Sequence, residues 1–189
     1  MKTKTKFRAT DIAECAISIV LMVVATFISI PFPPVPLTFQ TVVSVLAGLL
    51  LGWKKGIISM SVYCFMGLAG LPVFTGGGGI AYVLKPTFGY ILGFIAAAGV
   101  GGLIVGNGNV SFRRYVIAAL AAFFADYIIG MPYCIVAAHF LGVKDMVHLL
   151  VFGNLLYMPK DAVLSILGAF LARAVFPYVR KPEKKVKQN

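Results

Sequence analysis

"PTFGYILGFIAAAGVGGLIV", residues 86–105, is a run of 20 residues without a charged side chain. An α-helix needs about that length to cross the hydrocarbon core of a bilayer. The run opens with Pro86, and proline suits the first turn of a helix. The whole chain has a similar character, with 60% hydrophobic and 12% charged residues and a mean hydropathy of +0.94. This composition favours a membrane protein over a soluble one.

Five further apolar segments surround this one. We therefore expect an all-α integral membrane protein whose six transmembrane helices cover residues 11–30, 39–52, 56–70, 86–105, 114–138 and 159–176. The second and third are short for a full span. The apolar but mixed residues 139–158 predict a short surface helix. Residues 1–189 are expected to form one membrane domain, with a basic N-terminal segment (1–10), an external glycine-rich lid loop (71–85) and a basic tail (177–189).

The lysines and arginines predict the topology. If the N-terminus is inside, 14 of the 17 lie on the inner side, and only Lys85, Lys144 and Lys160 lie outside. The positive-inside rule then places both termini in the cytoplasm and makes the chain a multi-pass protein of the plasma membrane. The net charge of +11 is thus explained by topology and by attraction to anionic lipid, without nucleic acid as a partner.

Four consecutive glycines, residues 76–79, lie in the predicted external loop. The chain has no G-x-x-x-x-G-K-[ST] motif, so this is not a nucleotide-binding loop of that kind. Two interpretations stay open. One is a flexible linker; the other is a mobile lid, because glycine lets the backbone approach a ligand closely.

Polar side chains inside the helical bundle are costly and therefore mark candidate functional positions. They are Gln40, Asp126, Asn154, Lys160 and Asp161. Most are expected in the outer half of the membrane, with Asp126 as the floor of a shared cavity. Such a set suits a small amphipathic anion, although pairing between helices is an alternative explanation for any one of them.

Motifs for chemistry are missing from the sequence. It contains neither nucleophile–base and zinc-protease patterns nor a Cys/His cluster, so we expect no catalysis, no metal and no cofactor. Small residues at Ala9, Ala13 and Ala16 predict close packing of the first helix against a partner helix, or against its own bundle. The rival functions are a stand-alone, channel-like small-solute transporter and a small membrane enzyme.

The chain resembles the BioY family in four stretches: "VPLTFQT", "GLPVFTGGGGIAYVLKPTFGYILGF", "ADYIIGMPY" and "MPKDAVLSILGAFLA". The family comprises the biotin-specific substrate-binding (S) subunits of energy-coupling factor (ECF) transporters. The resemblance implies a six-helix S-component fold with an external biotin site, closed by the loops after the first and third helices. It also implies docking to a transmembrane T subunit through Ala9 and Ala13, and import powered by two cytoplasmic ATPases that alone use ATP.

The resemblance turns the polar and aromatic candidates into proposed biotin ligands. Asp161 or Asp126 would accept from the ureido N–H groups, and Asn154 or Gln40 would serve the ureido oxygen. Lys160 would neutralise the carboxylate or orient Asp161. The full expected set is Phe39, Gln40, Gly78, Gly79, Tyr82, Lys85, Tyr90, Asp126, Asn154, Lys160 and Asp161.

Overall fold

The structure is a computed structural model that describes residues 7–30, 36–106, 110–145, 148 and 154–179. It is built from α-helices, with one 3₁₀ helix and two isolated β-bridges in the described part. The elements are α1 (Ala9–Phe27), α2 (Gln40–Leu51), α3 (Trp53–Leu68), η1 (Ile80–Leu84), α4 (Phe88–Val105), α5 (Phe112–Phe140) and α7 (Met158–Val179). The prediction of a helical membrane protein is confirmed.

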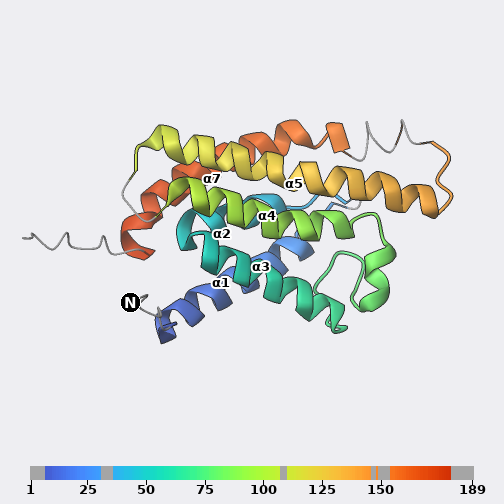
Figure 1. Ribbon diagram of the computed structural model, residues 1–189, viewed down its shortest axis with the longest axis horizontal. Helices are drawn as coiled ribbons and strands as arrows, with labels where there is room; N and C mark the ends of the chain where they lie inside the picture. The colour runs from blue at the N-terminus through green and yellow to red at the C-terminus, as the bar shows by residue number, and fades with distance from the viewer. Residues whose placement is uncertain (1–6, 31–35, 107–109, 146–147, 149–153, 180–189) are drawn as a thin grey trace, which may run out of the picture.

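The helices form a bundle with α2 and α4 in the middle (Figure 1). On one side of this pair lie α5 and α7, and on the other lie α1 and α3. The central helix α4 contacts α2, α3 and α5. This arrangement explains why α4 is apolar all round, since a helix surrounded by others has no polar face.

Small residues let α4 approach its neighbours closely. Gly48 of α2 packs directly on the backbone of Ala98, and a Cβ at this glycine would collide with the Ala98 carbonyl. Gly102 of α4 likewise lies against the backbone of Trp53. Contacts of this kind hold membrane helices together where lipid offers no hydrophobic driving force.

Only four of the described helices have the length and apolarity to cross a membrane: α1, α4, α5 and α7. With 12 and 16 residues, α2 and α3 extend roughly 18 and 24 Å at about 1.5 Å per residue, short of a hydrocarbon core of about 30 Å. A single residue joins them, Gly52, whose φ of 81° favours glycine. The third helix therefore begins at Trp53, and its predicted start at residue 56 is wrong.

The other predicted helix ends lie within three residues of the observed ones. Pro86 lies outside α4, which begins at Phe88 after Thr87 as N-cap. Residues 71–85 do not form a plain loop, because η1 occupies Ile80–Leu84. Of the predicted surface helix over residues 139–158, the first two residues continue α5, residues 141–145 form a turn and irregular chain, and Met158 begins α7, while residues 146–147 and 149–153 lie outside the described residues.

Basic side chains separate to the two ends of the bundle. The starts of α1, α3 and α5 and the last turns of α7 meet at one end (left in Figure 1), and they carry Arg8, Lys54, Lys55, Arg113, Arg114 and Arg173. The lid loop, the end of α5 and the start of α7 meet at the other. That second end carries Lys85, Lys144 and Lys160.

Candidate functional site

The lid, residues 71–85, is a folded unit between α3 and α4. Phe74 and Gly77 form a β-bridge, and the N–H of Gly79 donates to the carbonyl of Gly67 at 2.7 Å. Gly77 and Gly79 have φ of 100° and 103°, values that only glycine adopts without strain. Part of the glycine run is therefore needed to fold this segment, and its action as a mobile lid stays a prediction.

Aromatic rings anchor the lid to the bundle. Phe74 is 3% exposed and packs against Gly67 of α3, where a Cβ would collide with its ring. The ring centroid of Phe74 lies 4.6 Å from that of Tyr82 and 5.5 Å from that of Tyr63, which it meets edge-on. The Tyr133 hydroxyl donates to the carbonyl of Val83, so α5 also holds the lid.

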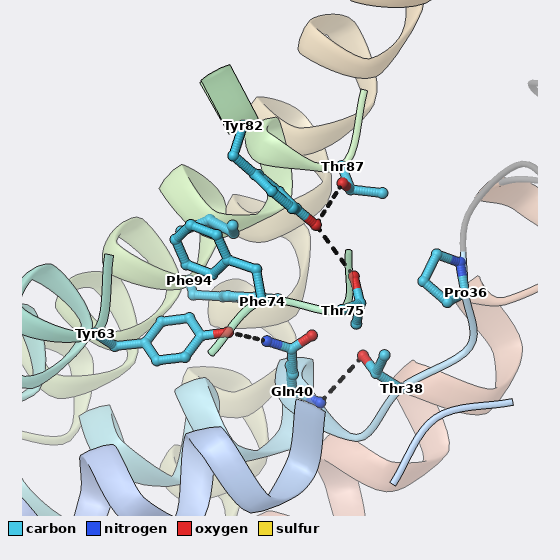
Figure 2. A pocket seen from close by; sticks show the side chains of 10 residues that line it. Pro36, Thr38, Gln40, Tyr63, Phe74, Thr75, Tyr82, Thr87 and Phe94 are labelled. Carbon is cyan, nitrogen blue, oxygen red and sulfur yellow. Dashed lines mark hydrogen bonds between the residues drawn. The ribbon is translucent and has the colours of Figure 1, made fainter. Parts of the chain in front are cut away.

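Under the lid lies a pocket, here called the lid pocket (Figure 2). Its volume of about 40 Å³ has room for a few water molecules, far below the roughly 300 Å³ or more of typical small-molecule sites. A larger solute would fit only after a rearrangement of the residues that line the pocket. The lining residues are Pro36, Thr38, Gln40, Tyr63, Phe74, Thr75, Tyr82, Thr87, Ile91 and Phe94.

Two hydroxyl-centred networks shape the lid pocket (Figure 2). On the lid side, the Tyr82 hydroxyl lies 3.1 Å from Thr75 Oγ1 and accepts from Thr87 Oγ1 at 3.0 Å. On the bundle side, Gln40 Nε2 donates to the Tyr63 hydroxyl at 2.8 Å. The pocket therefore combines ring faces with a few fixed polar groups, as small-molecule sites do.

A second polar group, here called the α7 cluster, lies where α7 begins. Lys160 Nζ donates to the carbonyl of Thr38 at 2.8 Å and pairs with Asp161 Oδ1 at 2.7 Å. The other oxygen of Asp161 accepts from the Tyr127 hydroxyl at 2.8 Å. Lys160 also lies 5.7 Å from the centre of the Phe39 ring. Because Thr38 lines the lid pocket, the cluster adjoins that pocket.

The remaining buried polar candidates connect helices. The Thr41 hydroxyl donates to Asp126 Oδ2 at 3.1 Å, and the Tyr90 hydroxyl donates to Asn154 Oδ1. Asp126 and Asn154 are both 0% exposed. The other oxygen of Asp126 is buried without a hydrogen-bond partner among the described residues, beside Gly93.

The structure brings together some predicted site residues and separates others. Gln40 and Tyr82 line the lid pocket. The α7 cluster contains Lys160, Asp161 and Phe39 at its edge, while Tyr90, Asn154 and Asp126 lie deeper between helices. Away from the pocket, Gly78 packs on the carbonyl of Leu71, Gly79 bonds to Gly67, and exposed Lys85 donates to the carbonyl of Gly76 at 2.9 Å.

Eight pocket-lining residues had no place in the predicted site: Pro36, Thr38, Phe74, Ile91 and Phe94, together with Tyr63 and the two threonines that contact Tyr82, Thr75 and Thr87. Tyr63 did carry a signal, because a tyrosine in the middle of an apolar helix needs a partner for its hydroxyl. The two threonines had none, since their role depends on the position of Tyr82.

The half of the bundle nearer the basic end is packed with apolar side chains. Val45, Leu49, Ala97, Ala118 and Ala172 belong to one buried cluster there.

The fold and site define a class: an integral membrane protein that holds a small solute at one end of its helical bundle. The BioY family model matches residues 1–181. The chain is 40% identical over 163 residues to the probable biotin transporter BioY of Lysinibacillus sphaericus, covering 85% of this chain and 83% of that protein. It is 36% identical over 166 residues to the probable biotin transporter BioY of Pyrococcus horikoshii, covering 87% and 95%.

A solved structure agrees with these relatives. The crystal structure at 2.1 Å of the S-component for biotin from an ECF-type ABC transporter matches with a TM-score of 0.71 and 26% identity, covering 93% of this chain and 94% of that one. The chain belongs to the BioY family.

Proposed function

We propose that this protein is the biotin-binding S subunit of an ECF-type importer in the plasma membrane. It captures biotin outside and delivers it inward with a transmembrane T subunit and two ATPases. The observation that carries the proposal is the match of nearly the whole chain to a solved S-component for biotin, within a family model that spans residues 1–181.

The lid pocket and the α7 cluster are complementary to the two ends of biotin. The ring system, with two N–H donors, is placed among Gln40, Phe74 and Tyr82. The carboxylate extends past Thr38 to Lys160, whose ammonium group has three donors and uses two of them on Thr38 and Asp161. An ionised carboxylate beside an ammonium group forms a strong, charge-assisted hydrogen bond.

Surface exposure of α1 supports docking of the T subunit there. Ala9, Ala13 and Ala16 are all exposed, so this small-residue face points away from the bundle. The comparable alanines of α5, Ala118 and Ala122, are 0% exposed and pack internally. The alternative of internal packing therefore fits α5, and docking to a partner helix fits α1. The S subunit itself needs no cofactor, and ATP is hydrolysed by the partner subunits.

A stand-alone channel is disfavoured by the apolar packing of the half of the bundle nearer the basic end. A channel needs a continuous path that is polar or wide. Here the apolar packing lies between the lid pocket and the basic end of the bundle. Without partner subunits, this protein is expected to bind biotin and to hold it on the outer side.

Calorimetric titration of the detergent-purified protein tests the proposal. Biotin is expected to give saturable heat with one-to-one stoichiometry, and thiamine and riboflavin are expected to give none. Equal heats for all three vitamins, or none with biotin in the presence of the T subunit and ATPases, would contradict the assignment.

A further inference from the structure

The Tyr63 hydroxyl is the centre of a fully enclosed hydrogen-bond network. Tyr63 is 0% exposed. Its oxygen lies 2.9 Å from the carbonyl of Val73, 2.8 Å from Gln40 Nε2 and 3.0 Å from Thr26 Oγ1. These partners come from the lid, α2 and α1, so one hydroxyl connects three parts of the fold.

The single hydrogen of this hydroxyl can form only one of these three hydrogen bonds as donor, the one to the Val73 carbonyl. A backbone carbonyl can only accept, so the short contact with Val73 requires that Tyr63 donate to it. The Tyr63 oxygen can then only accept from Gln40. The Thr26 hydroxyl also lies 2.9 Å from the carbonyl of Met22, so its hydrogen has an acceptor in either direction.

The side-chain amide of Gln40 is fixed in the same way. Its NH₂ group must face Tyr63, because a carbonyl oxygen in that place would meet an oxygen with no hydrogen to give. Oε1 therefore points the other way, toward the space beside Thr38 and Thr75 (Figure 2). Within the described part of the chain, no hydrogen bond is formed to Oε1.

The pocket thus presents an acceptor at this point, and the neighbouring hydroxyls of Thr75, Tyr82 and Thr87 are engaged with one another. A ligand that placed an oxygen against Gln40 Oε1 would bury two acceptors together. A ligand N–H satisfies the group instead, and leaving a buried acceptor unpaired is costly.

We propose that Tyr63 is a positioning residue that presents Gln40 to the lid pocket as an acceptor, so that the pocket selects a ligand with an N–H donor there. The inference rests on the proposed function, in which the donor is a ureido N–H of biotin. It reverses the role predicted for Gln40 from the sequence, which was to serve the ureido oxygen.

Orientation is tested directly by NMR on wild-type protein labelled with [¹⁵N]glutamine. The chain has two glutamines, Gln40 and Gln188, so Gln188 serves as an internal reference. The Gln40 NH₂ is expected to show contacts to the ring hydrogens of Tyr63, and slow hydrogen exchange, with and without biotin. Contacts between that NH₂ and bound biotin, with none to Tyr63, would overturn the proposal.

Selectivity is tested with biotin and its two analogues methylated on one ureido nitrogen. For wild-type protein, one regioisomer is expected to bind at least about tenfold more weakly than biotin. In Gln40→Met, biotin itself weakens by about tenfold and the penalty for that regioisomer shrinks severalfold. Biotin methyl ester is altered at the other end of the ligand. Its loss of affinity relative to biotin should be the same in wild type and in Gln40→Met.

Epistasis tests whether Tyr63 acts through Gln40. Tyr63→Phe alone should lower biotin affinity severalfold. In a Gln40→Met background, the same change should lower the affinity little further. Tyr115→Phe, which removes a buried tyrosine hydroxyl in the half nearer the basic end, is the matched control.

The possible failures are distinct. Unchanged methylation penalties in Gln40→Met, with tight biotin binding by wild type, overturn the acceptor role and leave the proposed function intact. Absence of biotin binding by wild-type protein overturns both. If Tyr63→Phe does not fold, the NMR contacts of the wild-type protein still decide the orientation.

Discussion

Lys160 and Thr38 join the α7 cluster to the lid pocket: the ammonium group donates to the Thr38 carbonyl at 2.8 Å while pairing with Asp161 at 2.7 Å. The lysine side chain is 26% exposed and the aspartate side chain 7%. One donor hydrogen of Lys160 thus remains for a ligand at the edge of the pocket. Whether it meets a carboxylate there can be measured.

Replacement of Lys160 by methionine is expected to weaken biotin binding by roughly 10- to 100-fold, because a partly desolvated charged hydrogen bond contributes about 1.5–3 kcal/mol. The same substitution should lower the affinity for biotin methyl ester much less than the affinity for biotin. Equal losses for the two ligands would mean that Lys160 only orients Asp161. Lys144→Met, an exposed lysine at the same end, is the control.

Lys85 makes two contacts within the lid, and these predict an effect on the rate of ligand dissociation. Its ammonium group donates to the carbonyl of Gly76 and lies 4.8 Å from the centre of the Tyr82 ring. Because Lys85 itself is exposed, Lys85→Met should raise the dissociation rate of biotin only about two- to fivefold. Stopped-flow chase with unlabelled biotin measures it. Lys85→Arg should restore part of the effect, whereas a hundredfold loss would identify Lys85 as a direct ligand.

Packing between α4 and α5 predicts a difference between two glycines. A Cβ at Gly93 would collide with the backbone and carboxylate of Asp126, whereas one at Gly101 would lie 3.2 Å from the Ala122 methyl group. Gly93→Ala should therefore cost about 1–3 kcal/mol of stability through overpacking. Gly101→Ala should cost less. Thermal unfolding in detergent compares them, and equal melting temperatures would contradict the close approach of Gly93 to Asp126.

Docking through α1 predicts a separation of binding from assembly. Ala13→Leu adds bulk to an exposed small-residue face and should greatly reduce co-purification with the T subunit. Biotin affinity should stay within about twofold, because the change adds no group near the lid pocket. The change in binding free energy should therefore be far below the roughly 1.4 kcal/mol that corresponds to a tenfold effect. Ile117→Leu, exposed on α5, is the control. Unimpaired assembly of Ala13→Leu would move the docking face elsewhere.

Much of the fold could be predicted because the hydrophobic runs have helical length and the lysines and arginines lie near their ends. The exceptions have local causes. Gly52 reverses the chain within one residue, so α3 starts earlier than the lysines beside it suggest. In the lid, Ile80–Leu84 forms a 3₁₀ helix because tertiary packing of Tyr82 overrides a loop-like sequence.

The site was harder to predict because its partners come from different helices. Asp126 and Asp161 are recognisable as costly buried carboxylates, but their partners Thr41 and Tyr127 become visible only when the helices are placed. Tyr63 shows the same difficulty, because its partners are distant in the sequence. In an apolar helix it resembles a packing residue, and its role depends on a lid carbonyl ten residues away and on Gln40.

The lid supplies Phe74, Thr75 and Tyr82 to the wall of the pocket that it covers. Any movement of the lid that widens the pocket therefore also displaces part of the pocket wall. A partner protein that moved this segment away from α3 would therefore weaken the hold on a bound ligand without touching the ligand itself.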